Sequence, residues 1–366
     1  MAQYPRYNIG MGGWLRIWMG LGLLLAAGWG VSGPIPPGQP YPVYLPMVLK
    51  QAAATPAATP APTPGATPNP GGDNPNPPAS PVKLIFIHHS TGGNWLADPA
   101  GNELGGGLGQ TLMQNNYYAS ATNYGWSVAG DPIGDRTDIG NWWEWFRGPD
   151  SAGYLAALYA ENGQNFGDYG AWPRLASDPG GPNRIVVFKS CFPNSALQGD
   201  PSAAPPAIGS NPLRGQDAYS PEHTIANAKG IYIDLLGYFG QHPEKLFVVV
   251  TAPPLSDGSW AENARAFNNW LVNDWLQNYS PRNVAVFDFY NVLTSNAGSP
   301  STSDLGAAGG NHHRWWNGAV QHLQTVASGT LAYPSGDDHP NRAGNEKAAA
   351  EFIRLLNVFY HRWAGN

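Results

Sequence analysis

The sequence predicts an α/β protein of three layers, in which a parallel β-sheet lies between helices on both of its faces. Apolar runs rich in β-branched and aromatic residues recur along the chain, at 84–87, 184–188, 246–250 and 284–287. Such continuous runs are typical of strands buried on both faces of a parallel sheet. Apolar residues at helical spacing stand between and after them, at 225–239 and 352–359. Strands that alternate with helices join by right-handed crossovers and give this architecture.

A polar cluster, His88-His89-Ser90-Thr91, follows the first apolar run and precedes two glycines. Open α/β sheets bind their ligands at the carboxyl edge, where this cluster is expected to lie. The glycines let backbone N–H groups turn towards a bound group. We therefore predict that Ser90 is a nucleophile; the alternative is a serine that only begins a turn or caps a helix.

Two further polar residues stand where a hydrolase needs them. Asn194 follows the run at 184–188 and offers an amide donor at the same edge, where one donor to an oxyanion contributes roughly 3 kcal/mol. His339 lies just before the last predicted helix and has acidic neighbours. A carboxylate bonded to one ring nitrogen fixes the tautomer, and the other nitrogen accepts the serine proton.

The composition excludes several classes of function. Charged residues make up 12% of the 366, and the net charge is -6, whereas a nucleic-acid partner requires a basic patch. Cys191 is the single cysteine, so neither an intramolecular disulfide nor a cysteine-based zinc site is possible. The low charge and the many Gly, Asn and aromatic residues favour an extracellular protein.

The first 33 residues predict export of the protein. Two arginines precede an apolar run at 17–31, which is the pattern of a secretory signal and is shorter than the roughly 20 residues of a spanning helix. Residues 1–33 are therefore predicted to be a signal peptide or an uncleaved membrane anchor, so that the protein is secreted or held on the outer face of the cell membrane. Residues 34–81, rich in Ala, Thr and Pro, are predicted to form a disordered linker. The catalytic domain is predicted at 82–366.

The motifs resemble the SGNH (GDSL-like) hydrolase superfamily over nearly the whole predicted domain. Ser90 matches the serine of that family's first block, although His88-His89 replaces the usual Gly-Asp. Asn194 matches the asparagine of the third block. His339 matches the histidine of the fifth block, although no Asp stands three residues before it.

This resemblance implies a flavodoxin-like sheet and ester hydrolysis through an acyl-enzyme, with no metal or organic cofactor. It also implies an oxyanion hole in which a backbone N–H joins Asn194 and the Ser90 N–H. Gly134 is the best match for that N–H, and Gly140 is the alternative. From the residues themselves, a long Trp-rich insertion of loops and short helices is expected between 101 and 182, where its loops shape a substrate cleft.

Asp337 is expected to orient His339, with Asp338 as the alternative. The substrate is expected to be a small ester or an acylated polysaccharide, and removal of acetyl groups from a polysaccharide is the specific hypothesis. Three tryptophans are candidates for substrate contact: Trp95, Trp142 and Trp315.

Three other functions remain open. Cys191 with His339 makes a thiol hydrolase conceivable, although a lone Cys beside Phe192 is more often a small buried apolar residue. Three adjacent pairs suggest metal-dependent hydrolysis, namely His88-His89, His312-His313 and Asp337-Asp338, but adjacent side chains on a strand point in opposite directions. Paired tryptophans suggest a non-catalytic module that binds polysaccharide; they are Trp142, Trp143, Trp145, Trp315 and Trp316.

Overall fold

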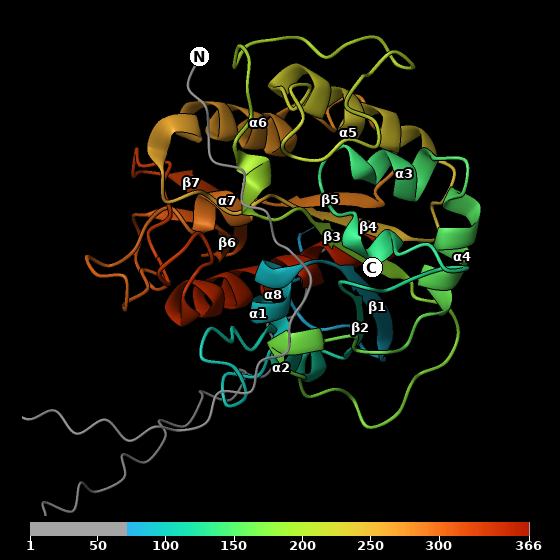
Figure 1. Cartoon of the computed structure of the whole chain (residues 1–366). Helices are drawn as coiled ribbons and strands as arrows, with labels where there is room; N and C mark the ends of the chain where they lie inside the picture. Colours follow the sequence, from blue (N-terminus) through green and yellow to red (C-terminus); the bar gives the residue numbers. More distant parts are fainter. Residues whose placement is uncertain (1–71, 366) are drawn as a thin grey trace, which may run out of the picture. The chain divides into compact units, whose positions relative to one another are not determined.

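A five-stranded parallel sheet forms the centre of the molecule (Figure 1). The computed structural model describes residues 72–365; the predicted signal peptide or anchor and most of the predicted linker lie outside the described residues. The sheet has the order β2-β1-β3-β4-β5, which is the flavodoxin-like order. Its strands are β1 (Val82–Ile87), β2 (Tyr117–Thr122), β3 (Ile185–Lys189), β4 (Leu246–Val250) and β5 (Val284–Phe287). The predicted fold class is confirmed.

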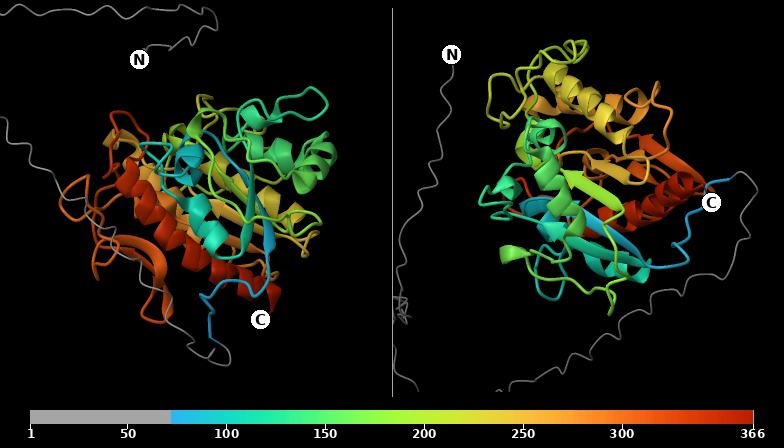
Figure 2. Two further views of the ribbon diagram at one scale, coloured as in Figure 1. Left: turned by 90° about the horizontal axis from the view of Figure 1, so that it is seen from below. Right: turned by 90° about the vertical axis from the view of Figure 1, so that its right-hand side faces the viewer.

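Helices cover both faces of the sheet, so the molecule has the three predicted layers (Figures 1 and 2). Alternate residues of β1 explain this arrangement, because Leu84 and Phe86 pack into one apolar core while Ile85 and Ile87 pack into the other. The first core is covered by α1 (Ser90–Leu96), α2 (Leu108–Gln114) and α8 (Arg342–Ala364). The second is covered by α3 (Asn141–Arg147), α4 (Ser151–Ala160), α5 (Ile225–Phe239) and α6 (Ala261–Asn273).

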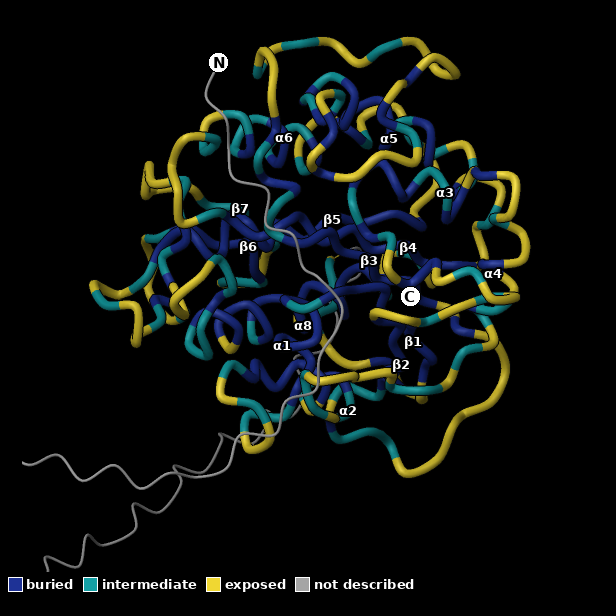
Figure 3. The backbone as a smooth tube through the Cα atoms, in the orientation of Figure 1, coloured by how far each residue is buried: buried dark blue, intermediate teal, exposed yellow. Residues whose placement is uncertain are grey.

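The region between 101 and 182 contributes a strand to the central sheet, which the sequence did not predict. It supplies the edge strand β2, which pairs with β1 so that Ile87 lies opposite Thr122. The sequence of β2, YYASAT, lacks the continuous apolar run of the other strands, so the pattern of apolar runs does not reveal this strand. All six of its residues are nevertheless buried (Figure 3).

A two-stranded antiparallel hairpin, β6 (Asn311–Trp316) and β7 (Ala319–Gln324), follows β5 and the short helix α7 (Phe289–Val292). Buried polar pairs attach the hairpin region to α8. His312 Nδ1 lies 2.7 Å from a carboxylate oxygen of Glu351, and Lys347 Nζ lies 2.6 Å from Asp304. Buried charges of this kind are stable only when they are paired, so these contacts fix how the hairpin lies on the helix.

The folded unit begins earlier than residue 82. Asp73 accepts two hydrogen bonds from the Arg362 guanidinium, at 2.6 and 2.7 Å. The Asn357 side chain donates to the carbonyl of Pro75, and the Asn116 side chain donates to that of Pro78. The last ten residues assigned to the linker therefore hold backbone carbonyls that α8 and the turn before β2 use. Of the helices within 72–365, none is both apolar and long enough to cross a bilayer.

Removing residues 72–81 is expected to destabilise the domain. A chain that starts at residue 82 should lose about 1–3 kcal/mol of unfolding free energy relative to one that starts at 72, because buried amide groups lose their acceptors. Asp73→Ala in the longer chain is the control, and it should cost roughly 0–1 kcal/mol because its ion pair is exposed to water. Urea unfolding of the three proteins measures both differences. Equal stabilities of the two chains contradict this assignment of the boundary.

Stability is also expected to fall in mild acid. Burial lowers the pKa of His88 and His313 to about 3 and that of His223 to about 4. In the unfolded chain the pKa is about 6.5, so below that pH the unfolded chain binds protons that the folded protein excludes. The stabilisation is present above about pH 6.5 and is lost below it, by about 1.4 kcal/mol per pH unit for each histidine.

Urea unfolding measured between about pH 7 and about pH 5 tests this expectation. The midpoint should fall steadily towards acid, and the fall should be shallower in His223→Gln, which lacks one titrating ring. A midpoint that does not change with pH in this range is incompatible with three neutral buried histidines.

Candidate active site

Ser90 lies at the carboxyl edge of the sheet, where β1 turns sharply into α1. It is the first residue of that helix, and His89 is the residue that precedes it as N-cap. The helix passes so close to the end of the strand that a Cβ atom on Gly92 would overlap the Cβ of His88. The glycine after Ser90-Thr91 is therefore required for the close turn that presents the Ser90 hydroxyl.

The structure brings together Ser90, His339 and Asp337. Ser90 Oγ lies 2.8 Å from His339 Nε2, although the two residues are 249 positions apart in the sequence. On the other side of the ring, Nδ1 lies 3.0 Å from a carboxylate oxygen of Asp337. The order hydroxyl, imidazole, carboxylate is the arrangement in which a histidine can accept the serine proton.

Local bonds fix the loop that carries His339. Asp337 accepts the backbone N–H of His339 at 2.8 Å and the hydroxyl of Ser335 at 3.0 Å. Asn341 caps α8 by accepting the N–H of Gly344. Phe192 meets the imidazole edge-to-face, with ring centroids 5.0 Å apart. The ring is thus held by its own loop, by the helix cap and by an aromatic neighbour.

Of the two candidate acids, Asp337 is the one bonded to the histidine. Asp338 turns away and accepts the backbone N–H of Ser256 at 2.7 Å. Burial raises the pKa of the Asp337 carboxyl, but the hydrogen bonds from His339 outweigh it, and that pKa lies below its usual value. Asp337 therefore remains an anion at neutral pH. Its side chain is 62% exposed, so water screens its charge.

Cys191 lies beside the same hydroxyl. Its Sγ is 3.4 Å from Ser90 Oγ and 3.0 Å from the hydroxyl oxygen of Thr91. Burial raises the pKa of the thiol, but the buried Lys189 ammonium and the hydrogen bonds from Ser90 and Thr91 outweigh it, so the net pKa is lowered. The imidazole of His339 is hydrogen-bonded to Ser90, whereas the thiol contacts hydroxyl groups.

The two predicted oxyanion donors are engaged elsewhere. The Gly134 N–H donates to the Trp126 carbonyl at 2.9 Å, so the prediction that it serves the oxyanion is wrong in this structure. The Asn194 amide nitrogen donates to Asp138 at 2.6 Å and to the Cys191 carbonyl at 3.3 Å. Both of its hydrogens have acceptors, and its side chain braces the loop before α3. The alternative glycine, Gly140, precedes α3 and is packed against backbone oxygens.

Two tyrosines that the sequence analysis missed face Ser90. Tyr124 follows β2, and Tyr169 ends the short 3₁₀ turn η2 (Gly167–Tyr169). The Tyr124 ring stacks on His89, the neighbour of Ser90, and the Tyr169 ring packs on Gly93, one turn after Ser90 on α1. Burial raises the pKa of each phenol, and the contact with Ser90 offsets only part of that rise, so both remain protonated at neutral pH.

The tryptophan predictions need correction. Trp95 is fully buried and packs against Phe287 and Phe352 in the core under the sheet. Trp142 is also fully buried, and its ring N–H donates to the Ser190 hydroxyl at 2.9 Å. Neither ring presents a face to solvent, so neither can stack on a sugar. Trp315 is partly buried on the β6–β7 hairpin, outside the five-stranded sheet that carries Ser90.

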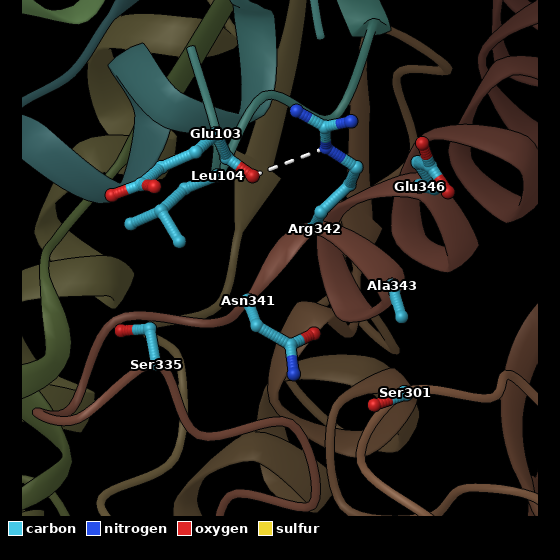
Figure 4. A pocket seen from close by; sticks show the side chains of 8 residues that line it. All are labelled: Glu103, Leu104, Ser301, Ser335, Asn341, Arg342, Ala343 and Glu346. Carbon is cyan, nitrogen blue, oxygen red and sulfur yellow. Dashed lines mark hydrogen bonds between the residues drawn. The ribbon is translucent and has the colours of Figure 1, made fainter. Parts of the chain in front are cut away.

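A cleft of about 460 Å³ opens beside the loop of His339 (Figure 4). Ser335 lies in its wall and also donates to Asp337, so the cleft and the loop share a residue. Arg342 crosses the cleft towards the carbonyl of Glu103, and Glu346 lies further along α8. Burial raises the pKa of the Glu346 carboxyl. The lining is rich in groups that donate and accept hydrogen bonds.

The histidine pairs do not converge on a common point. His312 bonds Glu351, whereas His313 accepts the backbone N–H of Asp288 at 2.9 Å. Within residues 72–365, no group of three or more His, Cys, Asp or Glu side chains is arranged to hold a metal ion.

Comparison with known proteins adds little to this geometry. No family model and no curated protein matches the chain. One solved structure is similar over 75% of this chain and 96% of its own length, with 15% sequence identity and a TM-score of 0.32. A likeness of this size carries no argument about function, so the site must be interpreted from its own chemistry.

The two neighbouring aspartates allow a matched test of the site. Asp337→Asn should lower kcat for ester hydrolysis by roughly tenfold to a hundredfold, less than the roughly 10⁴-fold seen for a buried triad Asp, because this carboxylate is exposed. Asp338→Asn keeps the oxygen that accepts from Ser256 and should leave kcat near the parent value. Steady-state kinetics of both variants decides the matter, and equal losses would contradict the assignment of Asp337.

Proposed function

We propose that the chain is an extracellular serine esterase of the SGNH kind, which hydrolyses an ester through an acyl-enzyme. The observation that carries this proposal is the hydrogen bond of 2.8 Å between Ser90 Oγ and His339 Nε2, together with the bond of the same imidazole to Asp337. A second support is the position of Ser90 at the carboxyl edge of the sheet, where α/β proteins bind their ligands.

The reaction proceeds in two steps. Ser90 Oγ attacks the ester carbonyl carbon while its proton passes to His339 Nε2. The tetrahedral intermediate collapses, the bond to the alcohol breaks, and His339 returns the proton to the leaving oxygen. In the second step His339 accepts a proton from water, which attacks the acyl group on Ser90. The acid leaves and Ser90 regains its proton.

Asp337 contributes by holding the imidazole in the tautomer that has its proton on Nδ1. Its lowered pKa keeps the carboxylate charged, which stabilises the imidazolium that forms in each step. These steps use the side chains of Ser90, His339 and Asp337 and require no cofactor.

The expected substrate is a small ester or an acylated polysaccharide. The polar cleft beside Ser335 supports the second class, because the serine hydroxyls and glutamate carboxylates in its lining can hydrogen-bond sugar hydroxyls. Export, expected from residues 1–33, would bring the protein to such polymers. Release of acetate from acetylated xylan or pectin tests this narrower proposal, and cleavage of short-chain esters without such release would restrict the substrate to small esters.

The thiol alternative keeps one argument in its favour, namely the lowered pKa of Cys191. Against it stands the imidazole, which bonds the serine. A binding module without catalysis is the other alternative. Its case is weakened because all five of its proposed tryptophans are fully or partly buried.

Hydrolysis of p-nitrophenyl acetate by the purified protein tests the proposal. Ser90→Ala and His339→Ala should each lower kcat by at least about a thousandfold, because each removes a member of one catalytic unit. Cys191→Ala is the matched control and should keep kcat within about tenfold, because it removes only a neighbour of the hydroxyl. Full activity of Ser90→Ala, or loss confined to Cys191→Ala, contradicts the proposal and favours the thiol.

A further inference from the structure

Two of the oxyanion donors that the sequence suggests, Gly134 and Asn194, are engaged elsewhere, and this raises the question of what replaces them. An oxyanion needs preorganised donors close to the nucleophile, each worth roughly a hundredfold to a thousandfold in kcat. Here the Gly134 N–H and both hydrogens of the Asn194 amide are already accepted by protein oxygens. The N–H of Ser90, at the first position of α1, is a donor that the helix itself does not use.

Two tyrosine rings, those of Tyr124 and Tyr169, pack on the residues that flank the nucleophile, His89 and Gly93. β2 runs parallel to β1 with Thr122 opposite Ile87, so Tyr124 and His89 each lie two residues beyond a paired position. Their rings stack, with centroids 3.9 Å apart and planes inclined by 25°. His89 Nε2 in turn donates to the Gly134 carbonyl at 2.6 Å. Tyr124 is half exposed, but this stack fixes its ring beside Ser90, and the Ser90 hydroxyl lowers the pKa of its phenol in part.

Tyr169 is fixed from the other side. Its ring packs on Gly93, one turn after Ser90 on the same helix, and a Cβ atom at Gly93 would lie 2.5 Å from the ring. The Asn102 side chain donates to the carbonyl of Tyr169 at 2.7 Å, which anchors the backbone of η2. A side chain at position 93 would clash with the Tyr169 ring, so glycine is required there for the ring to pack beside the N-terminal end of α1, which carries Ser90.

We propose that Tyr124 and Tyr169, with the Ser90 N–H, form the oxyanion hole, each phenol donating its O–H to the oxygen of the tetrahedral intermediate. This inference rests on the proposed esterase function. The oxyanion forms on the oxygen that is bonded to the carbon attacked by Ser90. Its donors must therefore lie near the serine hydroxyl.

The same arrangement explains two other features of the site. The histidine pair that replaces the family's usual Gly-Asp before the serine has a use, since His89 supplies the surface on which Tyr124 lies. Gly134 acts through its carbonyl, which holds His89, and not through its N–H. Both phenols keep their protons at neutral pH because burial raises their pKa, so each can donate a hydrogen bond there.

Removal of each hydroxyl tests the proposal. Tyr124→Phe and Tyr169→Phe should each lower kcat for p-nitrophenyl acetate by about tenfold to a hundredfold with little change in KM, and the double variant should lose more. Tyr238→Phe is the matched control, because its hydroxyl bonds that of Tyr159, which lies near the start of β3 at the opposite edge of the sheet. It should keep the parent kcat.

A second measurement separates catalysis from a role in shaping the pocket. Phenylboronic acid forms a tetrahedral anion on a reactive serine, so its inhibition constant should rise in each tyrosine variant by about the same factor as kcat/KM falls. Parent kcat in both variants, or a change in KM alone, overturns this inference and leaves the esterase proposal intact. A parent protein without esterase activity overturns both.

Discussion

The direction of the strands is the constraint on which the candidate site depends. In a parallel sheet every carboxyl end meets the same edge, so the residues after β1, β2 and β3 are brought together whatever their distance in sequence. The bond between Ser90 and His339, across 249 positions, forms because α8 also begins at that edge.

Much of the fold could be predicted from the sequence, because β1, β3, β4 and β5 are continuous apolar runs and the last helix has a clear cap. Ser90 and His339 could be predicted for the same reason, since the first follows a strand and the second precedes a helix. Asp337 and Asp338 could be separated only by the structure, because the turn of a loop decides which of two adjacent carboxylates meets the ring.

The position of Tyr124 could not be predicted, because the pattern of apolar runs did not reveal strand β2. β2 is buried but contains Tyr, Ala, Ser and Thr, so its sequence carries no apolar run. Without β2 in the sheet, nothing indicates that Tyr124 emerges beside His89 and Ser90. Trp142 was expected to contact substrate from an insertion of loops and short helices, whereas α3 packs it into the core on the other face of the sheet from the apolar side chains of β2. Hydrogen-bond competition was also invisible in the sequence: Asn194 and Gly134 have the expected residue types, but Asp138 and the Trp126 carbonyl occupy their donors.

The most direct measurement is to locate the residue that reacts with a serine-directed phosphonate, by mass spectrometry of peptides from the labelled protein. The account predicts a single modified residue, Ser90, and a strongly reduced rate of labelling in His339→Ala, because the imidazole must accept the proton as the bond to phosphorus forms. Modification of Cys191 or of a serine elsewhere, or an unchanged rate in His339→Ala, would contradict it.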